Sequence, residues 1–103
     1  MFRRDPFRDV ISRQLDIFER DEAWLIRDTE DANTAYNRAP HDEAEEYYEK
    51  FSDLVETGTE LLAEIRDAYM RSMDEDAAER YEASFNRAVK KRFPRFALQI
   101  SDY

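Results

Sequence analysis

The chain has 103 residues, a length typical of one domain. Charged residues make up 40% of it and hydrophobic residues 42%, with one glycine and three prolines, which is typical of long helices. It has no cysteine, which excludes a disulfide framework and cysteine-ligated zinc. No apolar run is long enough to span a bilayer, and no signal-peptide core follows Met1. We therefore expect a single all-helical domain over residues 1–103, cytoplasmic and without membrane contact.

The charge is distributed unevenly along the chain. The net charge is −9, yet residues 1–13 and 87–95 are both net positive. Residues 14–86 carry 22 acidic and seven basic side chains. A middle segment this acidic repels phosphate backbones, so it argues against nucleic acid binding along the body of the protein.

The first predicted helix covers residues 6–37. Asp5 is suited to the N-cap and Pro6 to the first helical position. An apolar pattern follows, and residues 39–41 (Ala-Pro-His) then form a short connection. A tight link between two long helices favours an antiparallel helical hairpin.

One column of residues along the first helix, spaced seven apart in the sequence, interrupts its apolar pattern. Gln14, Asp21 and Asp28 fall between two apolar columns, so we expect them in the buried face. A lone buried carboxylate is costly and needs a partner. The favoured interpretation is a structural salt bridge, or a polar residue that fixes the register of the bundle. Two alternatives are a ligand or metal pocket, and a bend of the helix that turns the column toward solvent.

The second predicted helix covers residues 42–73. Asp42 with Glu45 has the spacing of a capping box. Gly58 keeps the apolar register, so we expect one continuous helix in which this glycine lets a neighbouring backbone approach; the alternative is a hinge there. The apolar positions are spaced three and four apart, as in helix bundles. They are Tyr48, Phe51, Val55, Gly58, Leu62, Ile65 and Tyr69.

A shorter third helix is predicted over residues 75–92, with Ser72 and Asp74 as rival N-caps. Pro94 should end it, and the tail over 94–103 folds back on the bundle or docks elsewhere. The first two helices would each be about 48 Å long and the third little more than half of that. We therefore expect a homodimer, or a higher homo-oligomer, to complete the bundle by two-fold symmetry. The alternative is a monomeric three-helix bundle.

Two acidic pairs, Glu43-x-x-Glu46 and Glu64-x-x-Asp67, stand out on the second helix. The pattern resembles the magnesium-binding ExxE…ExxD motif of all-α nucleotide pyrophosphatases of the MazG type. This resemblance, which covers only these four residues, implies that carboxylates from two packed helices hold the metal. On a continuous helix Glu43 and Glu64 are about 31 Å apart and point away from the apolar face. We therefore interpret them as a solvated acidic surface, unless the helix breaks at Gly58.

The single histidine, His41, lies in the predicted connection. It lacks the Glu-x-x-His spacing of di-iron carboxylate bundles. With no cysteine and one histidine, the chain also offers little for a nucleophilic triad. We expect no cofactor.

Five cations and two aromatic residues cluster near the C-terminus of the third helix. The favoured interpretation is that the cations complement the helix dipole and neutralise the acidic bundle. The alternatives are contact with an acidic protein partner or with nucleic acid. These residues are Arg87, Lys90, Lys91, Arg92, Phe93, Arg95 and Phe96.

The favoured function is a non-enzymatic helical interaction module, a self-associating scaffold or adaptor. One alternative is a divalent-metal-dependent enzyme similar to the all-α nucleotide pyrophosphatases. The other is a small nucleic-acid-associated regulator that uses the basic C-terminal segment.

Overall fold

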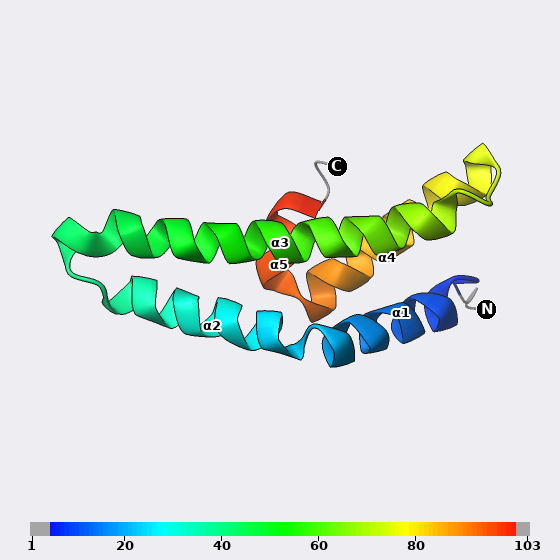
Figure 1. Cartoon of the computed structure of the whole chain (residues 1–103). Coiled ribbons are helices and arrows are strands. Elements are labelled where there is room, and N and C mark those ends of the chain that lie inside the picture. Colours follow the sequence, from blue (N-terminus) through cyan, green and yellow to red (C-terminus); the bar gives the residue numbers. More distant parts are fainter. Residues whose placement is uncertain (1–4, 101–103) are drawn as a thin grey trace.

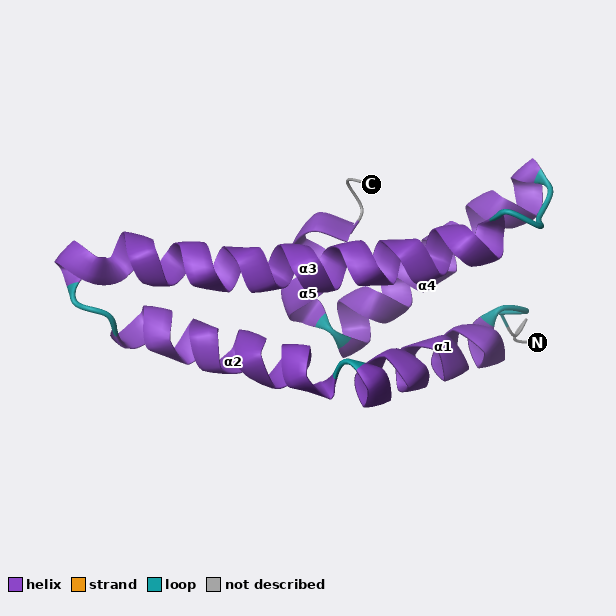
Figure 2. Cartoon of the chain, in the orientation of Figure 1, coloured by secondary structure: helices purple, strands orange, loops and turns teal. Residues whose placement is uncertain are grey.

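The computed structural model describes residues 5–100, and every regular element in that range is a helix (Figures 1 and 2). The all-α prediction is therefore confirmed for this range. The elements in chain order are α1 (Arg8–Asp21), α2 (Ala23–Arg38), the 3-10 turn η1 (His41–Glu43), α3 (Ala44–Met70), α4 (Glu75–Arg92) and α5 (Pro94–Ile100).

The long helix α3 crosses the whole molecule, and α1 and α2 follow one another along it (Figure 1). The chain reverses at Ala39 and Pro40, and α2 packs along the N-terminal half of α3. Both α4 and α5 pack against α3, and in Figure 1 they lie behind it. The result is an elongated body of 52 × 27 × 22 Å, two helices deep at one end and thicker at the other.

The helix predicted over 6–37 is in fact two helices that meet at Glu22. This residue has φ −115° and ψ 29°, outside the helical range, although its N–H still donates to the Phe18 carbonyl. Glu22 occupies the next position of the buried stripe, between Phe18 and Leu25. Burying a carboxylate there is costly, and the helix breaks at this one charged residue of the stripe.

Helix α3 continues through Gly58, so the prediction of an unbroken helix is confirmed and the hinge is not present. The predicted capping box of Asp42 and Glu45 is wrong. The chain enters α3 through the 3-10 turn, with Glu43 at the N-cap position and no side-chain capping hydrogen bond.

Helix α4 has the predicted bounds, and Asp74 is its N-cap because the Ala77 N–H donates to Asp74 Oδ1 at 2.8 Å. The rival Ser72 instead donates to the Tyr69 carbonyl. Pro94 follows the end of α4, as predicted, and the residues after it form α5, which folds back against α3 and α4. The predicted tail continues to residue 103, and its last three residues lie outside the described range.

The buried stripe of α3 is rotated relative to the predicted one. Tyr48 and Tyr69, at the two ends of the predicted stripe, are 50% and 38% exposed. Thr59, Ala63 and Arg66 are buried instead. The rotation follows from α4 and α5, which pack on the side of α3 that carries these residues. The buried apolar cluster is Ile11, Leu15, Phe18, Leu25, Val55, Leu62, Tyr81, Phe85, Val89, Phe93 and Phe96.

Candidate functional site

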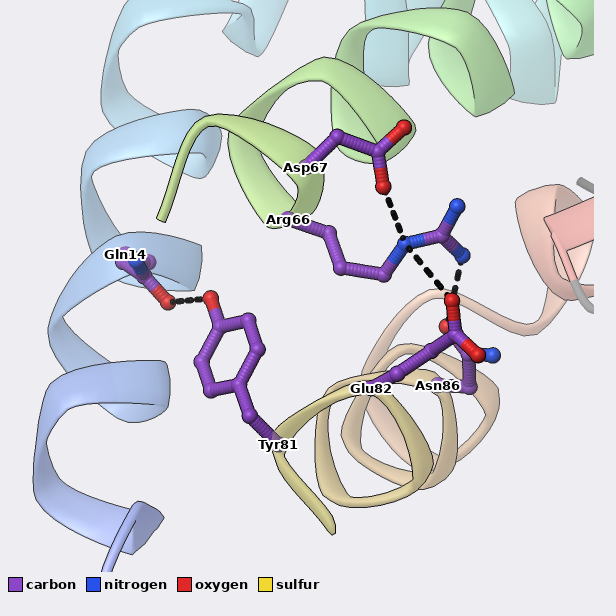
Figure 3. A network of polar contacts seen from close by, with 6 residues as sticks. All are labelled: Gln14, Arg66, Asp67, Tyr81, Glu82 and Asn86. Atoms are coloured by element: carbon purple, nitrogen blue, oxygen red, sulfur yellow. Dashed lines mark hydrogen bonds and ion pairs between the residues drawn. The ribbon is translucent and has the colours of Figure 1, made fainter. Parts of the chain in front are cut away.

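A buried arginine lies where α3 meets α4 (Figure 3). Arg66 is 1% exposed, yet it carries a charge that must be compensated. Its Nε donates to Asp67 Oδ1 at 2.9 Å, and its Nη1 donates to Asn86 Oδ1 at 3.0 Å. Glu82 Oε2 lies 3.9 Å from Nε. Because Asp67 and Glu82 reach solvent, the guanidinium is linked to carboxylates that keep their hydration.

A second buried polar pair joins α1 to α4. The Tyr81 hydroxyl donates to Gln14 Oε1 at 2.7 Å (Figure 3). Burial raises the pKa of Tyr81 to about 12, so the hydroxyl remains a hydrogen-bond donor even where a free tyrosine would ionise. Among the side chains of residues 5–97, no buried nitrogen or oxygen lacks a hydrogen-bond partner. The two polar contacts join α3 to α4 and α1 to α4.

Gln14 is the one member of the predicted polar column that contacts the core. The column's two carboxylates are not buried: the side chains of Asp21 and Asp28 are 53% and 49% exposed. Each lies beside the preceding arginine, at 2.9 Å for Arg20 and 4.0 Å for Arg27. The buried stripe runs instead through the neighbouring column, so this column lies on the flank of the molecule.

The two acidic pairs stay apart. Glu43, Glu46, Glu64 and Asp67 are all exposed, and the unbroken helix α3 keeps the first pair remote from the second. Within the described range, no three carboxylate or histidine side chains come close enough to hold a metal ion. The geometry that the pyrophosphatase resemblance implies is therefore not formed by these residues.

Part of the basic C-terminal segment is engaged within the chain. Phe93 and Phe96 are 7% and 2% exposed, so their rings are not available as a stacking surface. Arg92 and Arg95 form ion pairs with carboxylates of α1 and α2, whereas Lys90 is exposed and forms no ion pair among the side chains of residues 5–97. The pairs are Arg92 with Asp16 at 2.7 Å and Glu19 at 2.6 Å, and Arg95 with Glu30 at 3.0 Å. The other two members, Arg87 and Lys91, are exposed.

A groove runs between α2 and α3, and Asp28 is the only predicted site residue that lines it. Its volume is about 560 Å³, within the range of ligand and docking pockets. Half-buried Tyr47 and Leu54 line it from α3, and Ala32 and Ala35 line it from α2. The remaining lining residues are polar: Asp28, Asp31, Lys50 and Asp53. The seven-residue spacing of Tyr47 and Leu54 was the available sequence signal.

The groove belongs to the face that α4 and α5 leave uncovered. On α2, Trp24, Asp28, Asp31 and Ala35 are spaced four, three and four apart, so they share one side of the helix. The other side carries Ile26, which with Thr29 lines a pocket against Phe93 and Phe96. Among the large apolar side chains of the described range, Trp24 is 46% exposed and Ile17 is 42% exposed.

Within residues 5–100, each helix is too short or too polar to cross a lipid bilayer. No protein-family model, curated protein or solved structure matches the chain.

Proposed function

We propose that this protein is a non-enzymatic helical interaction module that associates with a second copy of itself. The contact surface is the face of α2 and α3 turned away from α4 and α5. The observation that carries the proposal is the groove on that face, walled by Tyr47 and Leu54 and left open by the other residues that the structure describes.

The lengths of the helices explain why this face is open. Helix α4 has 18 residues and α3 has 27, so α4 cannot cover α3 from end to end. Over the N-terminal half of α3, the antiparallel pair with α2 forms a layer only two helices thick, and such a layer leaves apolar surface in water. Helix α2, with 16 residues, is about 24 Å long, so the layer that it forms with α3 spans less than half of the 52 Å length of the molecule.

A second copy fits this surface because a two-fold axis pairs identical patches. Two α2–α3 layers packed face to face make a four-helix bundle, in which each copy supplies half of the core. Two-fold pairing buries this face in both copies, so the face is not available to bind a third copy.

Light scattering on a sizing column, at low and high salt, tests the proposal. We expect the mass of a dimer, with association tightening as salt rises, since screening weakens the repulsion between two chains of charge −9. A monomer at every concentration and salt would overturn the proposal. A thermal shift on adding Mg²⁺ to such a monomer would favour the metal-dependent alternative.

Two variants locate the contact. Leu54→Glu and Ala35→Glu each place a carboxylate in the groove and should yield monomers. Ala83→Glu adds the same charge at an exposed position of α4 and should remain a dimer. Circular dichroism confirms that each variant is folded. Dimers in both groove variants would place the contact elsewhere.

A further inference from the structure

We infer that Trp24 is the anchor of this self-association, and that each copy inserts its indole into the α2–α3 groove of the other. The inference rests on the proposed function and adds to it a specific residue and its receptor.

Trp24 is the only tryptophan of the chain, and much of its side chain is exposed to solvent. It lies in the first turn of α2, two residues after the break at Glu22, and it is 46% exposed. Its indole N–H donates to Glu22 Oε2 at 2.9 Å on the surface. Tryptophan is the side chain most enriched among residues that dominate binding energy at protein interfaces, because it buries a large apolar area with few rotatable bonds.

The groove offers both space and polar partners for an indole. Ala32 and Ala35 are small, so they leave space between the larger walls of Tyr47 and Leu54. An indole N–H can only donate, and the groove supplies the carboxylates of three aspartates as acceptors. Lys50 also lines the groove, and its ammonium is suited to the face of an aromatic ring.

The spacing on α2 allows both indoles to be buried at once. Trp24 and the groove residues Asp31 and Ala35 lie on the same side of α2, and Ala32 is about 12 Å from Trp24 along the axis. A two-fold axis midway, near Asp28, places antiparallel α2 helices so that each Trp24 faces the groove of the partner copy. The same interface therefore buries two equivalent Trp24 side chains, one from each copy.

This geometry brings the Asp28 side chains of the two copies toward each other at the axis. Like charges placed close together oppose association. Asp28→Asn should therefore tighten the dimer by about two- to five-fold, whereas the same change at Asp42, exposed in η1, should leave it unchanged.

The single tryptophan provides the direct test. Its fluorescence, followed as the protein is diluted, should shift to longer wavelength and become more accessible to acrylamide as the dimer dissociates. Trp24→Ala should weaken dimerisation at least ten-fold, equivalent to about 1.4 kcal/mol. Ile17→Ala removes a similarly exposed apolar side chain from α1 and should change it less than about three-fold. Since both residues are exposed, both variants should fold.

The outcomes separate the inference from the proposed function. A dimer whose Trp24 emission does not change on dilution, or which survives Trp24→Ala, would overturn the inference and leave the proposed function intact. Equal weakening by Trp24→Ala and Ile17→Ala would also overturn it. A monomeric wild-type protein would overturn both.

Discussion

Gly58 and Phe96, 38 positions apart in the sequence, occupy one packing site. The Phe96 ring lies against the Gly58 Cα, where a Cβ would overlap three of its carbon atoms. Next to this contact, the Thr59 hydroxyl donates to the Phe96 carbonyl at 3.1 Å. The glycine in the middle of α3 therefore provides the space in which α5 docks.

Gly58→Ala should destabilise the protein, although alanine is the better helix former. The gain in helix propensity is about 1 kcal/mol. The added methyl group must, however, displace the Phe96 ring, which is 2% exposed, and such overpacking of a core costs about 1–3 kcal/mol. We expect a net loss of about 1 kcal/mol in the free energy of unfolding, measured by urea denaturation.

A second substitution tests the cause. In the background of Phe96→Leu, which makes the opposing side chain smaller, Gly58→Ala should cost less or become stabilising, because residues in contact are not additive. The same loss in both backgrounds would show that the ring is not the reason for the glycine.

The helices could be predicted where the local pattern and the packing agree. The bounds of α4 follow from Asp74 and Pro94, which act locally, and the continuity of α3 follows from its unbroken apolar register. The break at Glu22 was missed because helix propensity there is good. The break is caused instead by the cost of burying the Glu22 carboxylate, and that cost depends on which stripe of the helix faces the core.

The candidate site was harder to predict because it depends on where distant segments pack. Asp21 and Asp28 were assigned to the buried face on the assumption that the stripe is centred on their column. Which flank is covered depends on α4 and α5, and the sequence pattern did not place them. The groove at Tyr47 and Leu54 follows from the same placement, since α4 and α5 lie on the opposite side.

Tyr81 should make stability fall at high pH. Burial raises its pKa to about 12 from the ordinary tyrosine pKa of about 10, so above about pH 10 the unfolded chain loses the phenolic proton before the folded chain does. The stabilisation is complete below pH 10 and is lost as pH rises through 12, with a total of about 2–3 kcal/mol.

The measurement is urea denaturation between about pH 9 and about pH 11.5. Tyr81→Phe should flatten the pH profile, although it also loses the hydrogen bond to Gln14. Tyr48→Phe removes a hydroxyl from a side chain that is 50% exposed, and it should keep the wild-type slope. An unchanged slope in Tyr81→Phe would contradict the prediction.

Arg92 should contribute a salt-sensitive part of the stability. Its guanidinium bridges Asp16 and Glu19 of α1, and its own side chain is 30% exposed. Arg92→Ala should lower the free energy of unfolding by about 1 kcal/mol at low salt and by less at high salt, because ions screen exposed pairs. Arg20→Ala is the matched control, because Arg20 pairs with its neighbour Asp21 and the pair is open to solvent. It should not measurably change the free energy of unfolding. A loss that is independent of salt would mean that Arg92 acts through packing alone.

Arg66 should tolerate replacement by an apolar side chain of similar length better than truncation. Arg66→Ala leaves a cavity on α3 and removes a hydrogen bond from Asn86, so we expect a loss of about 2–4 kcal/mol in the free energy of unfolding. Arg66→Met fills most of the same space and buries no charge. The carboxylates of Asp67 and Glu82 remain 54% and 40% exposed and so keep their hydration, which limits the loss to about 1 kcal/mol. Chemical denaturation of the two variants gives the comparison directly. If Arg66→Met is as damaging as Arg66→Ala, then the charge of the guanidinium, rather than the space that its stem fills, holds α3 and α4 together.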